Sequence, residues 1–404
     1  MTTLIPSASP RVIRELADDL AVDADLRDRA GKPPFDEVSR LREAGLPALL
    51  TPAGQDGPDG RGSDWRTACT AVRDIAAADS SIAELLAHHH ALSWSPRLFG
   101  TPEDADALEL RAVQEQWLWG GDIELPDAQT DTDLALAPAA DGADGYVLHG
   151  RRSLTAGVAV ADRLVHTARR TDSGAWVVVH VDPAHPGVQA EPAHDLLGQR
   201  LSGAGGVSYD GVPVAAHQVL GTVPVDEHEI SPFTALAPLA RRLLLVQVGL
   251  GNAEGALAEA RDISRALPRP GPLAALDNGG DCGLPPTDPY LLLAYGELAT
   301  AAHSAAAVAE RATEALAQGL ATGPALGADE RADIAFLVGA AEAVTTRAAL
   351  HITTRVLELT ADAPSPSTDP GLDRFWRNAR ALTAHSSAAH RLRDIGEHYL
   401  NGLQ

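Results

Sequence analysis

The chain has almost none of the residues from which disulfide frameworks and zinc sites are made. Its 404 residues include two cysteines, Cys69 and Cys282, which lie far apart and follow neither CxxC nor Cys/His ligand spacing. We therefore expect neither a disulfide framework nor a metal site. Lys32 is the single lysine, which excludes Schiff-base chemistry on a lysine at any other position.

Positive charge is scarce as well. The sequence has 32 lysines and arginines against 55 acidic residues, a net charge of −23. A nucleic-acid surface needs a basic patch, so this class of partner is not expected. The sequence has no run of eighteen apolar residues, and its start lacks the basic and apolar regions of a signal peptide. We expect a cytoplasmic protein without a membrane partner.

What the chain does contain is 45% apolar residues and enough length for two or three packed units. Apolar residues recur at helical spacing through the first part of the chain, as in Val12, Leu16 and Leu20 and again in Val72 and Ile75. This pattern predicts an N-terminal helical domain over residues 1–118.

The residue pattern changes at about Trp119. Short alternating or β-branched runs follow, separated by turn formers such as Asp141-Gly142 and Asp172-Ser173-Gly174. The runs cover residues 134–138, 146–149, 163–167, 176–181 and 206–209. We predict a central β domain over residues 119–228.

The remaining residues, 229–404, are rich in alanine and leucine. They contain four long helical candidates, at about 236–260, 290–316, 329–359 and 373–399. A proline- and glycine-rich connection at 268–289 separates the first two. The pattern predicts a C-terminal bundle of about four helices.

Two stretches carry histidines in a helical context. In His88-His89-His90, successive residues point about 100° apart, so at most two rings can face one site. The stretch from Phe375 to His385 places an apolar anchor, hydrogen-bond donors and an imidazole at three- to four-residue intervals. Surface or core-edge positions are the alternative for the triplet, and a helix end with a satisfied histidine explains the second stretch equally well.

Several segments together resemble the acyl-CoA dehydrogenase superfamily. They are residues 145–157 (GYVLHGRRSLTAG) followed by Ala161-Asp162, residues 41–46 (LREAGL) followed by Thr51-Pro52-Ala53, and residues 198–205 (GQRLSGAG). The likeness is closest to the flavin-dependent monooxygenase branch, which includes the dibenzothiophene monooxygenases and the sulfur-acquisition oxidoreductases. Three further features carry it: His89 after a helix at 82–86, Asp288-Pro289-Tyr290 with Gly296-Glu297, and residues 372–380 (LDRFWRNAR) leading to His385.

This resemblance implies an α+β multidomain fold with an N-terminal helical domain, a central β-barrel domain and a C-terminal four-helix bundle. It implies a two-component flavin-dependent monooxygenase, in which a partner flavin reductase supplies the reduced flavin. The flavin and O2 form a C4a-hydroperoxide, which oxygenates a small apolar or heteroatom-containing substrate. FMN is the expected cofactor, with FAD possible, and the superfamily's subunit arrangement implies a homotetramer.

The same resemblance implies the site residues. His385 and His89 are expected to be catalytic, since an imidazole near the flavin can donate a hydrogen bond or take a proton. The expected cofactor-binding residues are Trp119, Thr155, Ala156, Gly157, Ser202, Arg265, Arg269 and Arg377. The small residues would permit close approach to the ring, and the 265/269 pair suits a phosphate, often across a subunit boundary. Trp119 as a core aromatic and Arg377 as a partner of nearby acids remain the alternatives.

Two other functions stay open at this stage. A true acyl-CoA dehydrogenase-type FAD oxidoreductase would need a glutamate base, for which Glu254 and Glu297 are candidates. A flavin-free, non-redox member of the fold is the other, because Asp122 and Glu124 stand where the family usually has Asn or Ser. A carboxylate beside a reduced anionic flavin is unfavourable, so we expect these two acids to point away or to serve the substrate.

Overall fold

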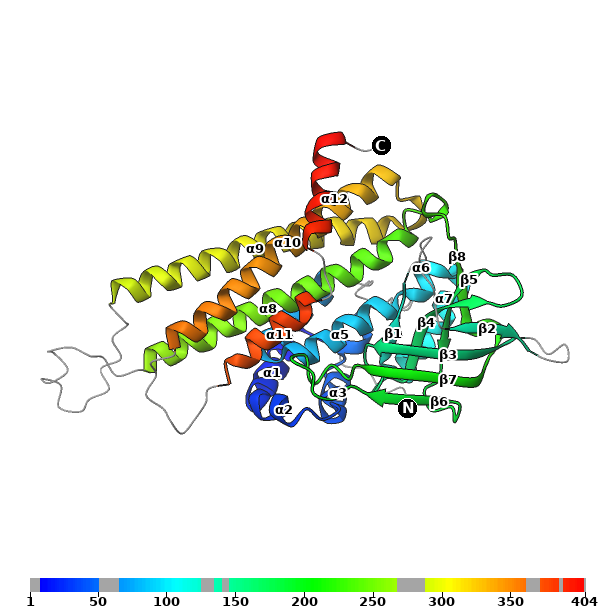
Figure 1. Ribbon diagram of the computed structural model, residues 1–404, viewed down its shortest axis with the longest axis horizontal. Helices are drawn as coiled ribbons and strands as arrows, with labels where there is room; N and C mark the ends of the chain where they lie inside the picture. The colour runs from blue at the N-terminus through cyan, green and yellow to red at the C-terminus, as the bar shows by residue number, and fades with distance from the viewer. Residues whose placement is uncertain are drawn as a thin grey trace, which may run out of the picture.

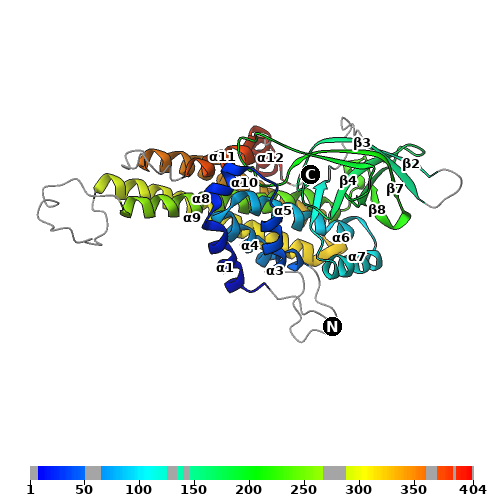
Figure 2. The ribbon, with the colours of Figure 1, turned by 90° about the horizontal axis from the view of Figure 1, so that it is seen from below.

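The computed structural model describes residues 8–50, 65–124, 134–139, 145–266, 288–360, 371–384 and 388–402. A sheet lies at one end of the molecule, and the far ends of α8 and α9 lie at the other, in both views (Figures 1 and 2). Two predicted site residues, Arg269 and His385, lie outside the described residues.

The N-terminal part is helical, as the spacing of its apolar residues predicts. Its helices are α1 (Pro10–Ala21), α2 (Ala24–Ala30), α3 (Phe35–Glu43), α4 (Trp65–Ala78), α5 (Ser80–Ser93), α6 (Ser95–Phe99) and α7 (Pro102–Gln114). Local chemistry fixes several of their starts. Asp79 caps α5, because its Oδ1 accepts the backbone N–H of Ser81 at 3.1 Å and of Ile82 at 3.3 Å.

Eight strands follow within the part of the chain that the structure describes. They are β1 (Trp119–Asp122), β2 (Ala135–Pro138), β3 (Tyr146–Thr155), β4 (Arg163–Arg170), β5 (Trp176–Val181), β6 (Val188–Pro192), β7 (Gly205–Val214) and β8 (Val219–Val223). The sheet order is β6-β7-β3-β2-β4-β5-β8, and β1 pairs in parallel with β4. One apolar cluster of valines and leucines packs within this sheet region.

The C-terminal helices are α8 (Ala237–Ala266), α9 (Pro289–Thr322), α10 (Ala328–Thr360), α11 (Asp373–Ala384) and α12 (Ala388–Asn401). The segment 373–399, expected to be one long helix, contains two, and α12 stands at an angle to α8, α9 and α10 (Figure 1).

The two helical parts share one hydrophobic core, although the β-rich segment separates them in sequence. Glycines on α8 permit the contact. A Cβ at Gly251 would lie 2.2 Å from the carbonyl oxygen of Arg73, and one at Gly255 would lie 2.1 Å from that of Ala77. Helices α4 and α8 therefore touch backbone to backbone, which a larger residue at either position would prevent.

Candidate active site

The ends of β1 and β3 are held together at the helical side of the sheet. The N–H of Gly121 donates to the carbonyl oxygen of Ala156 at 2.9 Å. Gly121 has φ +123°, and a Cβ there would lie 2.1 Å from the oxygen of Val165, so the position requires glycine. Gly157, with φ +68°, faces the side chain of Leu85 on α5. The turn at residues 155–157 is thus pressed between β1 and α5.

The histidine triplet lies on α5, and the backbone holds His89 from both sides. Its Nε2 donates to the carbonyl oxygen of Pro47 at 2.9 Å, and its Nδ1 accepts the N–H of Trp119 at 3.0 Å. Burial lowers the pKa of His89 to about 4, so the ring is neutral. The structure therefore gives His89 a structural position, with no free ring nitrogen for the catalytic role predicted from the resemblance.

His88 and Glu84 occupy the other face of α5, one turn apart. Both are partly buried, whereas Leu85 and His89 are fully buried. Burial raises the pKa of Glu84 to about 7, against the opposing effect of its hydrogen bond with Ser202. Burial and the positive charge of Arg241 lower the pKa of His88 to about 3. At neutral pH this face presents an uncharged imidazole beside a carboxyl group able to exchange a proton.

Asp122, at the end of β1, joins a hydrogen-bonded chain. Its Oδ1 lies 2.6 Å from Nδ1 of His166, and Nε2 of His166 lies 2.6 Å from the hydroxyl of Tyr209. Burial opposes ionisation of Asp122, but His166 and then Arg152 and Arg241 attract its charge and hold its pKa below the usual value. Arg152 also pairs with Glu124, at 3.3 Å. The two acids flagged in the sequence are thus charge-compensated.

Arg241, near the start of α8, belongs to the same neighbourhood. Solvent reaches its side chain within a cavity, but the surrounding protein lowers its pKa, and attraction to Asp122 and Glu124 opposes that effect. Within the described part of the chain Arg241 makes no hydrogen bond and no ion pair. The site therefore combines groups from α5, β1 and α8 around the turn at 155–157.

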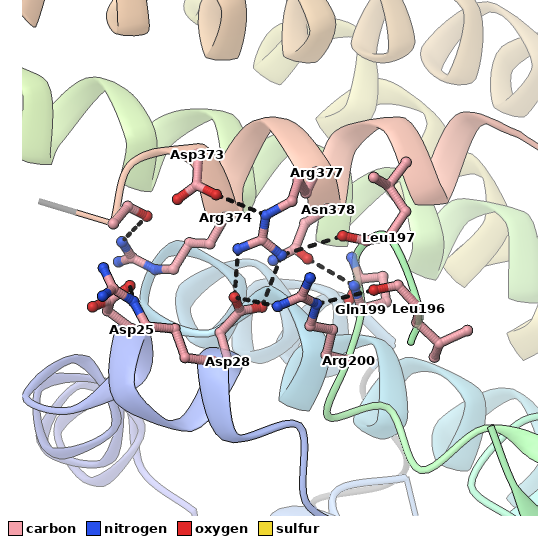
Figure 3. A network of polar contacts seen from close by, with 12 residues as sticks. Asp25, Asp28, Leu196, Leu197, Gln199, Arg200, Asp373, Arg374, Arg377 and Asn378 are labelled. Atoms are coloured by element: carbon pink, nitrogen blue, oxygen red, sulfur yellow. Dashed lines mark hydrogen bonds and ion pairs between the residues drawn. The ribbon is translucent and has the colours of Figure 1, made fainter. Parts of the chain in front are cut away.

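Arg377, expected to bind the cofactor, instead fastens α11 to two other parts of the fold (Figure 3). It donates to Asp28 of α2 at 2.5 Å, to Asp373 at 2.8 Å and to the carbonyl oxygen of Leu197 at 3.2 Å. The pairing with nearby acids that the sequence left open is therefore present, and this guanidinium is already occupied.

Other segments that carry the family resemblance are also in contact with one another. The side-chain oxygen of Asn378 accepts the N–H of Gln199 at 2.7 Å, which joins α11 to the loop before β7 (Figure 3). Arg42 pairs with Asp162 at 2.5 Å, and Asp162 also accepts the N–H of Leu118 at 2.6 Å. These motif residues hold the three parts of the fold in register.

The structure brings some of the predicted site residues together and separates others. Trp119 and Gly157 contact the face of α5 that carries Leu85 and His89, the adjacent Thr155 and Ala156 lie at the end of β3 beside β1, and Ser202 pairs with Glu84. Arg265 lies near the far end of α8. Sequence reasoning passed over Glu84, His88 as a site residue, His166 and Arg241. The i, i+4 spacing of Glu84 and His88 was the available signal for two of them.

Comparison with known proteins gives the family. The chain is 30% identical over 98% of its length to a probable FMNH2-dependent monooxygenase from Pseudomonas putida, covering 95% of that protein. It is 32% identical over 97% of its length to dibenzothiophene monooxygenase from Rhodococcus qingshengii, covering 93% of that protein. FMN-bound TdsC from Paenibacillus sp. A11-2 matches with TM-score 0.85 and 30% identity, over 97% of both chains. No protein-family model matches the chain.

Butyryl-CoA dehydrogenase from Megasphaera elsdenii also matches, with TM-score 0.76 and 18% identity over 96% of both chains, a likeness that shows the fold alone. The fold, the oxygenase class and the FMN cofactor expected from the sequence are confirmed. The chain therefore belongs to the family of FMNH2-dependent monooxygenases that includes the dibenzothiophene monooxygenases, and it has the acyl-CoA dehydrogenase fold.

Proposed function

We propose that this chain receives reduced FMN from a separate flavin reductase and holds it where α5, β1, the 155–157 turn and α8 meet. There it uses O2 to transfer one oxygen atom to a small substrate bearing a heteroatom. The observation that carries the location is that the charges of Asp122 on β1 and Arg241 on α8 both act on His88 of α5, one turn from Glu84.

The residues present fit a flavin. The hydroxyl oxygen of Thr155 is buried and has no hydrogen-bond partner among the described residues, and the adjacent Ala156 and Gly157 are small. The unfavourable effect of a carboxylate beside the flavin is offset here. His166 and Arg152 compensate the charge of Asp122, and Arg152 also pairs with Glu124. When bound, the flavin supplies the oxygen-activating chemistry.

The chain's own groups supply proton handling and orientation. His88 stays neutral at physiological pH, so its ring can both donate and accept a hydrogen bond at the junction. Glu84, with a pKa of about 7, can hold or release a proton near working pH, and Ser202 orients its carboxyl group. His385 keeps the catalytic role implied by the resemblance, as part of this proposal.

Arg265 fits a phosphate only in a neighbouring subunit. It lies 24 positions beyond Arg241 on one continuous helix, or roughly 36 Å at 1.5 Å per residue. It lines a cavity of about 440 Å³ between α8 and α9, together with Arg261, Tyr295 and His303. We assign this end of the molecule to contact with another copy in a homotetramer.

The surface of α9 supports that assignment. Tyr290 is 84% exposed and Leu293 is 72% exposed. Among the described residues, the segment 289–325 is long and apolar enough to cross a membrane by length and composition, criteria that helices of soluble proteins also meet. Packing against a second copy would cover these side chains.

Rapid mixing tests the proposed function. The protein is loaded anaerobically with reduced FMN, or with reduced FAD for comparison, and mixed with air-saturated buffer while absorbance is recorded. A transient band between the reduced and oxidised flavin spectra, formed without substrate, is the expected result. Tight FAD binding with bleaching by an acyl-CoA would instead indicate a dehydrogenase, and no flavin binding in any state would contradict both.

A further inference from the structure

A cavity of about 140 Å³ lies among α8, α10, α11 and α12, and its charged lining is unbalanced. Three arginines, Arg241, Arg242 and Arg391, face it together with one acid, Glu342. This surplus of guanidinium groups is confined to the cavity, whereas the chain as a whole has a net charge of −23. The rest of the lining is threonine and small or aliphatic residues, including Leu245 and Leu382.

Both carboxylate oxygens of Glu342 are paired with two of the arginines. Its Oε2 accepts Nε and Nη2 of Arg242 at 3.0 and 2.8 Å, and its Oε1 pairs with Nη1 of Arg391. Burial lowers the pKa of Arg391, and the charges of Arg242 and Arg241 add to that effect despite the attraction of Glu342. The cluster therefore retains net positive charge, and Arg241 is the arginine of the three that lacks a hydrogen-bonded partner among the described residues.

Arg241 also connects this cavity to the proposed oxygenation site. Its charge acts on His88 and on Asp122, which lie at the junction of α5 and β1. A ligand bound by Arg241 in the cavity would therefore lie next to the groups expected to act on the substrate. A guanidinium that lacks a carboxylate partner can bind an oxyanion through its planar fork with two parallel hydrogen bonds.

Resting on the proposed function, we propose that this cavity binds an anionic group of the substrate, a carboxylate, sulfonate or phosphate, with Arg241 as its principal donor. The substrate is then a small molecule with an acidic head and a short apolar body, the body packing on Leu245 and Leu382. This is more specific than the small apolar or heteroatom-containing substrate expected from the sequence.

Calorimetric titration of the full-length protein with benzoate, benzenesulfonate and phenyl phosphate tests the proposal, with neutral benzamide as the isosteric reference. We expect at least one of the anions to bind more tightly than benzamide. Arg241→Met should weaken that binding about tenfold to a hundredfold, and Arg241→Lys should weaken it less. Arg347→Met is the matched control, since Arg347 is exposed on α10 and does not line the cavity.

Three outcomes would overturn the proposal: no preference for any of the anions over benzamide, equal binding by wild type and Arg241→Met, or an equal loss in Arg347→Met. Titrations with reduced FMN and reduced riboflavin separate the substrate from the cofactor. If Arg241→Met weakens FMN binding and leaves the anions unaffected, the arginine serves the flavin. The mixing experiment above is read independently, because anion binding requires no oxygen chemistry.

Discussion

Arg377 of α11 and Asp28 of α2 are joined by a hydrogen-bonded ion pair of 2.5 Å, although 349 positions separate them. The side chains are 12% and 5% exposed, so water screens the pair little. The same guanidinium reaches the carbonyl oxygen of Leu197 in the loop before β7. One side chain thus connects the N-terminal helices, the β region and the C-terminal helices.

Breaking this pair should destabilise the fold. Arg377→Met removes the hydrogen-bonded partner of the buried Asp28 carboxylate, and we expect a loss of about 3–5 kcal/mol in the free energy of unfolding. Urea unfolding measures it. Arg11→Met is the control, because its pair with Glu15 is exposed and should cost less than about 1 kcal/mol. Equal losses of stability in Arg377→Met and Arg11→Met would contradict the stabilising role of the Arg377–Asp28 pair.

His88 and His89 should respond oppositely to replacement by alanine. His89→Ala leaves the Pro47 carbonyl and the Trp119 N–H unpaired and opens a cavity, so we expect a loss of about 2–5 kcal/mol in stability. His88→Ala should keep the melting temperature within a few degrees while product formation falls about a hundredfold or more. Thermal unfolding and product yield distinguish them, and a normal yield from His88→Ala would remove that residue from the site.

His385→Ala tests the role implied by the resemblance. Flavin binding should stay within a few-fold of the wild-type value, because the imidazole is expected to handle a proton rather than to hold the cofactor. Oxygenated product should disappear while hydrogen peroxide release rises, as peroxidase-coupled assay would report. An unchanged product yield would rule the role out.

Glu84 should make stability depend on pH. Its pKa is about 7 in the folded protein and about 4.5 when unfolded, so between these values the folded state binds more protons. Stability from this group is therefore complete below about pH 4.5 and is lost as the pH rises through 7, by up to about 3 kcal/mol. Glu84→Gln should be more stable than wild type at pH 8, relative to their difference at pH 4.5.

The comparison with wild type isolates Glu84 from the buried histidines, whose lowered pKa values act with the opposite sign. Glu103→Gln, at an exposed position on α7, is the control. Denaturant unfolding at several pH values gives the difference, and parallel curves for Glu84→Gln and wild type would show that Glu84 is not buried as described.

Arg265→Ala should weaken retention of FMN without changing the yield of product per flavin oxidised. The length of α8 places Arg265 far from the chain's own junction of α5 and β1. We therefore expect it to contact the phosphate of FMN bound by a neighbouring subunit. Equilibrium dialysis with FMN and riboflavin measures the effect, which should appear for FMN alone. Arg311→Ala, exposed on α9, is the control, and sedimentation should show a tetramer in all three proteins.

The sequence was enough for the class of fold and for the family. Apolar periodicity located the helices and strands because burial of one face imposes it, whatever the partner is. The motif segments identified the family, and the structure gives a reason for their residue types. Arg42 meets Asp162, and Gln199 meets Asn378, so these residues specify contacts between parts of the fold.

Which residues form the site was decided by the tertiary structure. The sequence could state that at most two of His88, His89 and His90 share a site, but the positions of Pro47 and Trp119 decide that His89 is tied to the backbone. Asp122 and His166 lie 44 positions apart, and Arg241 and Glu342 belong to helices whose pairing no local pattern encodes. Burial and charge at such positions depend on long-range packing, and so do the pKa values and the guanidinium of Arg241, unpaired among the described residues, on which the proposed chemistry rests.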